Sequence, residues 1–135
     1  MDILGIIRGL RKIYPDARVE LNFSNVWELM VAVILSAQCT DVRVNKVTPE
    51  LFKKYPSIES FAHSKLLELE QKIYSTGFYK NKAKNIKAAA RKIIADFGGK
   101  VPATMDQLLT LPGVARKTAN VILSSGFPKI PRGVG

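Results

Sequence analysis

Residues 26–35, VWELMVAVIL, predict a helix that is apolar on almost every side. Ser24 or Asn25, just before it, is the type of residue that caps a helix N-terminus. A helix without a polar face has to be enclosed by other elements, because any side turned to water would expose apolar surface. The stretch therefore predicts a buried central helix around which the rest of the chain packs.

Most of the remaining sequence also repeats its apolar residues at helical spacing, and no segment shows the alternation typical of a β-strand. We expect further helices over residues 3–14, from 40 or 41 to about 52, 65–75, 81–97, 104–110 and from the turn at 112–113 to about 125. Pro49 is expected to kink or interrupt the second of these. Ser64 is expected to cap the third, and Thr104 with Gln107 matches a capping box for the fifth. The sequence predicts an all-α fold.

Positive charge is concentrated in the second half of the chain. Residues 1–70 hold nine Lys/Arg and nine Asp/Glu, whereas residues 71–135 hold twelve Lys/Arg and two Asp/Glu. Four of these cations are spaced four, three and four residues apart and form a ridge along the helix predicted over 81–97: Lys80, Lys84, Lys87 and Arg91. One-sided charge of this kind favours a surface that binds nucleic acid. The alternative is a surface that only keeps the protein in solution.

Other classes of protein fit the sequence less well. With 47% hydrophobic and 24% charged residues the chain is globular, and no apolar run reaches the roughly 18 residues that cross a bilayer. The N-terminus, MDILGIIRGLRK, has no basic region or cleavage site of a signal peptide. The single cysteine, Cys39, excludes an internal disulfide and is typical of a reducing compartment. We expect a cytoplasmic or nucleoid-associated protein without a membrane partner.

The Pro-Gly turn in LPGVA, residues 111–115, joins two predicted helices into a helix-hairpin-helix over about residues 104–125. The backbone N–H groups around Gly113, Val114 and Ala115 are expected to point outward at a helix start, where they would bind a phosphate without reading sequence. Arg116 and Lys117 follow, at a position where cations are normally disfavoured. A bound phosphate would compensate for their charge.

Two interpretations of Lys117 are open. The helix start and Arg116 both disfavour its ammonium form, and partial burial would act in the same direction. A neutral amine can attack an electrophilic carbon and form a Schiff base. In the other interpretation, Lys117 is one more phosphate clamp on a basic surface.

Four segments of the chain resemble, in order and with natural spacing, those of the endonuclease III family, which are DNA glycosylases and abasic-site lyases of base excision repair. The segments are LSAQCTDVRVN (35–45), TGFYKNKAKNI (76–86), VPATMDQLLTLPGV (101–114) and LPGVARKTANVIL (111–123). The resemblance implies an HhH-GPD-like six-helix bundle or barrel over about residues 20–127. It also implies that residues 1–19 form an N-terminal helix, which in relatives packs on a cluster domain, and that residues 128–135 belong to an interdomain linker.

The same resemblance assigns roles to individual residues. It makes Lys117 the Schiff-base nucleophile that attacks the sugar C1′, Gln38 the residue that enters the space left by a flipped base, and Phe78 the wedge beside the opposite strand. Without the resemblance, Gln38 is equally well a polar residue at a helix end and Phe78 a core aromatic. The remaining residues expected to contact DNA are Lys80, Lys84, Lys87, Gly113, Val114, Ala115 and Arg116.

The implied activity is that of a bifunctional N-glycosylase and β-lyase for oxidised pyrimidines, whose partner is duplex DNA with a damaged base or abasic site. Lys117 and Gln38 favour it over adenine-mismatch glycosylases, which carry Tyr or Ser at the lysine position. Ala115 departs from the family's second hairpin glycine. The family's catalytic aspartate and the four cysteines of its 4Fe-4S cluster are expected beyond residue 135, so no metal or cofactor is expected within these residues.

From these departures we expect a truncated, monomeric chain that binds DNA with little turnover, although its apolar N-terminal helix could self-associate. Two alternatives belong to other classes. One is a non-catalytic helix-hairpin-helix module, and the other is a basic helical protein that binds an acidic protein or a membrane surface. The RKTAN and LSAQ-x-TD motifs argue against both, since a pure binding module needs neither.

Overall fold

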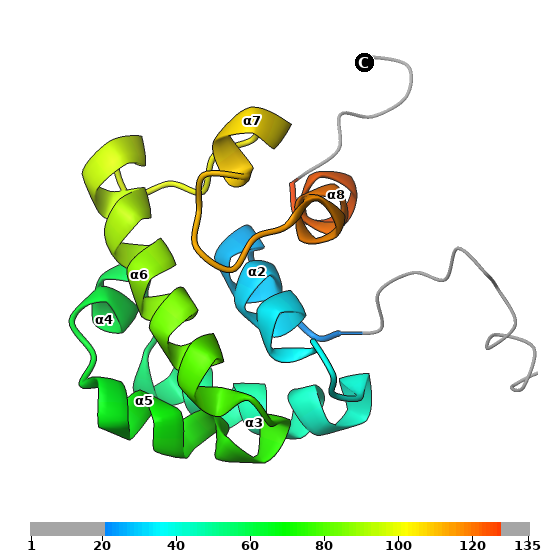
Figure 1. Ribbon diagram of the computed structural model, residues 1–135, viewed down its shortest axis with the longest axis vertical. Coiled ribbons are helices and arrows are strands. Elements are labelled where there is room, and N and C mark those ends of the chain that lie inside the picture. Colours follow the sequence, from blue (N-terminus) through cyan, green and yellow to red (C-terminus); the bar gives the residue numbers. More distant parts are fainter. Residues whose placement is uncertain (1–20, 128–135) are drawn as a thin grey trace, which may run out of the picture.

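The structure, a computed structural model, describes residues 21–127, and every regular element in this range is helical (Figure 1). In chain order the elements are α2 (Val26–Leu35), α3 (Asp41–Lys54), α4 (Ile58–Ala62), α5 (Leu66–Ile73), the 3-10 turn η1 (Tyr74–Thr76), α6 (Tyr79–Phe97), α7 (Met105–Leu108) and α8 (Arg116–Ser125). The all-α prediction is confirmed. The helix expected over residues 3–14 and the linker at 128–135 lie outside the described residues.

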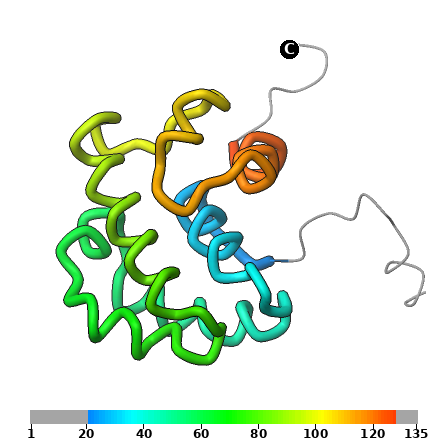
Figure 2. The backbone as a smooth tube through the Cα atoms, in the orientation of Figure 1, coloured from blue at the N-terminus to red at the C-terminus, as the bar shows by residue number. Residues whose placement is uncertain are grey.

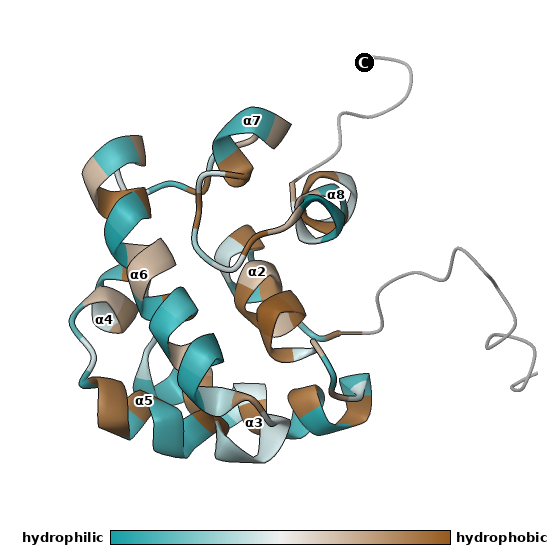
Figure 3. Ribbon diagram, in the orientation of Figure 1, coloured by the Kyte–Doolittle hydropathy of each residue, from teal (hydrophilic) through white to brown (hydrophobic). Residues whose placement is uncertain are grey.

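Helix α2 is the centre of the fold, as its sequence predicts. Its side chains from Leu29 to Ala32 are fully buried, and it packs against α3, α6 and α8. Figure 3 shows the hydrophobic colour along most of α2, whereas α6 also carries a hydrophilic face. The helix begins where expected, because the side-chain oxygen of Asn25 accepts a hydrogen bond from the backbone N–H of Glu28 at 2.9 Å.

Helix α3 runs without a break through Pro49, so the expected interruption at this residue is wrong. Thr40 caps the helix by accepting from the N–H of Arg43. Proline removes one hydrogen-bond donor from a helix interior. Here Val44 and Thr48 before the proline and Leu51 after it are all buried, so packing against the core holds the helix on both sides of Pro49.

The segment between α3 and α5 departs most from the sequence-based expectation. Helix α4 was not expected; it begins with a reciprocal capping box between Ser57 and Ser60. Ser64 does not cap the next helix. Its hydroxyl donates to the carbonyl of Phe61 at 2.7 Å, at the end of α4, and α5 begins after Lys65 without a side-chain cap.

Helix α6, with 19 residues, packs on α4 and α5, while α8 packs on α7 and on the central helix. The contact between α8 and α2 is very close at Gly126, just after α8, because an added Cβ there would lie 2.8 Å from the Val26 side chain. Figure 2 traces the chain from α6 through α7 and the hairpin to α8.

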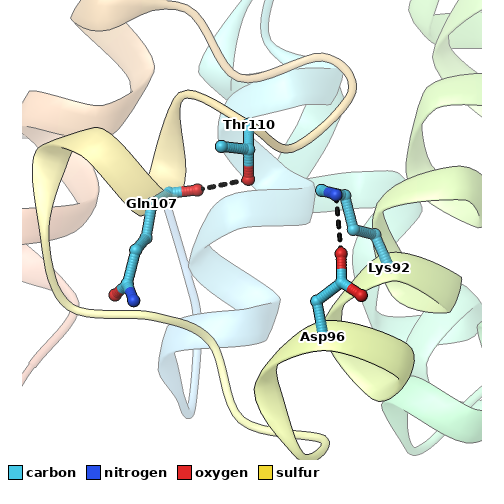
Figure 4. A network of polar contacts seen from close by, with 4 residues as sticks. All are labelled: Lys92, Asp96, Gln107 and Thr110. Atoms are coloured by element: carbon cyan, nitrogen blue, oxygen red, sulfur yellow. Dashed lines mark hydrogen bonds and ion pairs between the residues drawn. The ribbon is translucent and has the colours of Figure 1, made fainter.

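The start of α7 confirms half of the expected capping box. The hydroxyl of Thr104 accepts from the N–H of Gln107 at 3.2 Å. The Gln107 side chain does not reach back to the Thr104 backbone; its oxygen accepts from the Thr104 hydroxyl instead. Figure 4 shows two polar contacts near this end of the fold. There Thr110 donates to the Gln107 carbonyl, and on α6 an i,i+4 ion pair joins Lys92 to Asp96.

Candidate nucleic-acid interface

A cleft of about 380 Å³ opens where the end of α2, the start of α6 and the hairpin meet. Its lining residues are Val33, Ile34, Ala37, Gln38, Phe78, Asn81, Lys82, Asn85, Gly113 and Thr118. This volume falls within the range of about 300–1,000 Å³ typical of small-molecule sites. The cleft brings together three residues to which the sequence assigns a role in binding DNA, although they are separated by up to 75 positions in the chain.

Gln38 and Phe78, which both line this cleft, share an uncommon backbone conformation. Among the described residues they are the two non-glycine residues with positive φ, at 57° for Gln38 and 46° for Phe78. The left-handed region costs a residue with a side chain about 1–2 kcal/mol. Strained residues of this kind cluster at functional sites, where the surrounding structure holds them in place.

Phe78 is not a core aromatic, which was the alternative interpretation of this residue. It follows Gly77, caps the start of α6 with its backbone only, and is 67% exposed. A large apolar side chain in that position has no packing reason to be there. Its placement at the rim of the cleft suits a group that inserts into a base stack.

Gln38 lies three residues beyond the end of α2, in the turn that leads to Thr40. Its side chain is exposed, and it makes no hydrogen bond within the described part of the chain. The amide is therefore free to form hydrogen bonds with a ligand in the cleft. The helix end that carries it is held by Ser36, whose hydroxyl donates to the Val33 carbonyl.

The hairpin between α7 and α8 packs tightly against α6 at Gly113. This glycine has a φ of +84°, and a Cβ added to it would lie 2.9 Å from the Cβ of Asn85. Ala115, where relatives are expected to have a second glycine, has an ordinary φ of −94°. Alanine therefore fits at position 115 without backbone strain.

The expected row of outward N–H groups is wrong for Val114. Its N–H donates to the carbonyl of Leu111 at 3.1 Å and its side chain is buried. The N–H groups of Gly113 and Ala115 donate to no acceptor among the described residues and remain for an anion, together with the first turn of α8, which has no side-chain cap. Uncapped N–H groups at the start of a helix attract phosphate.

Arg116 and Lys117 are the first two residues of α8, as predicted, and both are exposed. The partial burial considered for Lys117 is therefore absent. Lys117 does not line the cleft, but the next residue, Thr118, does. The lysine thus lies beside the cleft, on the helix that forms one of its walls.

The cationic ridge does not take part in the cleft. Lys80, Lys84 and Arg91 are exposed and Lys87 is half-buried, but none of them lines it. Helical residues follow one another at about 100° around the axis, so the ridge runs along a different, neighbouring side of α6 from the lining residues Asn81 and Asn85. Contact between the ridge and DNA therefore stays a prediction.

Lys82 is the residue of the cleft that the sequence-based analysis missed. Its side chain is buried, and Nζ donates to the carbonyl oxygens of Leu35 at 2.7 Å and Thr76 at 2.8 Å. Burial lowers the pKa of this ammonium group, an effect that the nearby Cys39 thiol partly opposes. A signal was present, because Lys82 falls on the same helical stripe as the buried Ile86 and Ile93.

The described residues contain no cluster of three or more His, Cys, Asp or Glu side chains that could hold a metal ion. An iron-sulfur cluster of the 4Fe-4S type needs four thiolates, and the whole sequence offers Cys39 alone. These residues therefore do not fit such a cluster. None of the helices between residues 21 and 127 is both long and apolar enough to cross a membrane.

Known proteins resemble this chain closely. The profile of the HhH-GPD superfamily of base excision DNA repair proteins matches residues 31–130. Endonuclease III of Synechocystis sp. is 57% identical over 122 residues, which are 90% of this chain and 56% of that protein. Endonuclease III of Bacillus subtilis is 54% identical over 114 residues, 84% of this chain and 52% of that protein.

A solved structure described as a trapped endonuclease III–DNA covalent intermediate has 48% sequence identity to the chain and a TM-score of 0.80. The match covers 89% of this chain and 56% of that one. The chain thus spans about half the length of the relatives that it matches.

Proposed function

Because this chain belongs to the HhH-GPD superfamily of base excision DNA repair proteins, we propose that it binds damaged duplex DNA through the cleft and the α7–α8 hairpin. We further propose that Lys117 is the nucleophile of the family's N-glycosylase and abasic-site lyase chemistry, and that these residues by themselves bind DNA with little glycosylase turnover. Duplex DNA as the partner is supported by the similarity to an endonuclease III trapped on DNA. Oxidised pyrimidines as substrates are supported by the combination of Lys117 with Gln38.

The observation that carries this proposal is the placement of Gln38 and Phe78 around one cleft. A base buried in a duplex has to leave the stack before its glycosidic bond is accessible, and unstacking costs a few kcal/mol. An exposed aromatic side chain offsets part of this cost by stacking between the remaining bases. The free amide of Gln38 then replaces hydrogen bonds that the extruded base had made.

The chemistry is assigned to Lys117. Its amine forms a bond to C1′ of the extruded nucleotide, and the base leaves with the electrons of the glycosidic bond and takes up a proton. The nitrogen lone pair then forms a C=N bond to C1′ as the C1′–O4′ bond breaks, O4′ takes up a proton, and the product is a protonated Schiff base. Removal of a proton from C2′ then expels the 3′ phosphate, which is the β-elimination of a lyase.

Helix α8 supports this role in two ways. Its uncapped first turn attracts a DNA phosphate, which holds the backbone beside the lysine. The exposed Lys117 side chain is also free to move, so it can reach a sugar at the mouth of the cleft. Holding reactive groups close together can supply several kcal/mol of the reduction in the activation barrier.

Borohydride trapping on an abasic-site duplex tests the proposal. Borohydride reduces a Schiff base to a stable amine, so the wild-type chain is expected to form a covalent adduct with the DNA. Lys117→Ala should lose the adduct, and the control Lys72→Ala, an exposed lysine on α5, should keep it. Salt-sensitive duplex binding without any adduct would instead support a non-catalytic helix-hairpin-helix module.

A further inference from the structure

Lys82 connects two parts of the cleft that are far apart in the sequence. Leu35 is the last residue of α2, and Thr76 is the last residue of η1. The carbonyl oxygens of both residues accept hydrogen bonds from the same atom, the Lys82 Nζ, at 2.7 and 2.8 Å. One buried ammonium group therefore ties the end of one helix to the end of the other.

These two carbonyls belong to residues that come shortly before Gln38 and Phe78, the two non-glycine residues with positive φ in the described part of the chain. Gln38 follows Leu35 by three positions, and Phe78 follows Thr76 by two. The terminal carbonyls of a helix have no partner within the helix and carry partial negative charge, so a cation is a favourable donor for them. By fixing both carbonyls, Lys82 fixes the starting points of the turns that hold Gln38 and Phe78.

A role in stability alone explains this lysine poorly. No carboxylate within the described residues forms an ion pair with it, and desolvating an unpaired ion costs several kcal/mol. An apolar side chain on this buried stripe would avoid that penalty. An ammonium group, by contrast, has three hydrogens in fixed directions and can hold two oxygens at a set separation.

We propose that Lys82 is a positioning residue, which sets the separation of the Gln38 and Phe78 turns so that one side chain fills the gap in the duplex while the other wedges the stack. This inference rests on the proposed function of the cleft. It does not require Lys82 to touch the DNA or to exchange a proton with it.

The experiment uses a duplex with a tetrahydrofuran abasic-site analogue opposite 2-aminopurine, whose fluorescence rises when its stacking is lost. The full chain is titrated as wild type, Lys82→Met, Lys82→Arg and the control Lys72→Met. Affinity for an intact duplex and the thermal unfolding midpoint are measured on the same samples. Methionine keeps an unbranched apolar side chain but removes both hydrogen bonds, whereas arginine can still donate to two carbonyls.

Wild type, Lys82→Arg and Lys72→Met are expected to give fluorescence rises within twofold of one another. Lys82→Met is expected to reduce the rise at least fivefold, while its affinity for intact duplex stays within twofold of wild type. An unchanged rise in Lys82→Met, or equal losses in Lys82→Met and Lys82→Arg, would overturn the inference. A wild-type protein without any rise would overturn the proposed function of the cleft instead.

If Lys82→Met does not fold, Lys82→Gln replaces it in the comparison. Its amide is uncharged and shorter, and can reach only one of the two carbonyls. The rise should then fall at least threefold with intact-duplex affinity preserved, and a rise equal to that of the wild type would contradict the inference.

Discussion

Gly113 in the hairpin and Asn85 on α6 lie so close that a methyl group added to the glycine would come within 2.9 Å of the asparagine Cβ. The obstructing atom is attached directly to the backbone, so it cannot rotate away. This contact fixes the hairpin against α6 and thereby forms one wall of the cleft. Helix α8 begins three residues after Gly113, so the same contact places Lys117 relative to the cleft.

Gly113→Ala is expected to lower the free energy of unfolding by about 2–4 kcal/mol, since it adds overpacking to a strained left-handed backbone. Urea denaturation measures this change, and affinity for duplex DNA should fall with it. Gly98→Ala is the control, because Gly98 also has positive φ but open space around it. It should cost about 1 kcal/mol and leave DNA affinity unchanged.

At position 78 glycine is expected to be more stable than alanine, the reverse of the usual order in helical segments. Phe78 has a φ of 46°, which penalises any side chain by about 1 kcal/mol relative to glycine. Chemical denaturation of Phe78→Gly and Phe78→Ala gives the difference. At the exposed helical position Ala95 the order should be normal, with Ala95→Gly losing about 1 kcal/mol.

Both substitutions of Phe78 are expected to reduce binding to an abasic-site duplex at least tenfold, with little effect on intact duplex. The reason is that the wedge acts only where the stack is already weakened. Tyr74→Ala removes another exposed aromatic side chain, outside the cleft, and should not change this preference. Equal losses for the two duplexes would show that Phe78 contributes general affinity only.

Binding to intact duplex should weaken steeply with salt, because phosphate contacts release counterions. Arg116→Gln, at the uncapped start of α8, is expected to lower the slope of log affinity against log salt by about 1. The triple variant with glutamine at Lys80, Lys84 and Lys87 tests the ridge, where a fall of about 3 indicates direct contact. No change in the slope would assign the ridge to the side of the protein away from DNA.

The environment of Tyr55 predicts that the folded protein loses stability in alkali. The Tyr55 hydroxyl donates to Glu68 at 2.9 Å, and burial, together with the hydrogen bond to Glu68 and the charge of that residue, raises its pKa from 10.0 to about 12. Because the folded pKa lies above the unfolded one, the stabilisation is complete below pH 10 and disappears between pH 10 and 12. Tyr55→Phe should lose about 1 kcal/mol near neutral pH, and the gap from wild type should narrow in that alkaline range.

Local signals predicted the helices well where the cap and the apolar stripe agreed. Asn25 begins α2, and the central position of this helix follows from its composition. The errors occurred where long-range packing decides the outcome. Pro49 stays inside α3 because buried residues on both sides hold the helix. Ser64 bonds to the end of α4 and does not cap α5, and α4 is a short helix with a weak sequence signal.

The site was only partly predictable. Motifs pointed to Gln38 and Phe78, which line the cleft, and to Lys117, which does not. They gave no sign of the left-handed backbone at Phe78, since aromatic residues rarely adopt it. Lys82 was missed because one of its acceptors is a main-chain carbonyl 47 positions away, and a backbone oxygen leaves no trace in the sequence. The exposure of Lys117 could not be predicted from the sequence either, because it depends on the direction in which α8 leaves the hairpin.

The close contact between Gly126 and Val26 joins α8 to α2 at the ends of these helices that lie farthest from Gln38 and Lys117. Each helix has ten residues and is therefore about 15 Å long. If α8 rotated relative to α2 by about 4° at this contact, the far ends of the helices, at the mouth of the cleft, would shift by about 1 Å. A bulkier residue at position 126 would accordingly misalign the lysine from the opposite end of its helix, without touching DNA.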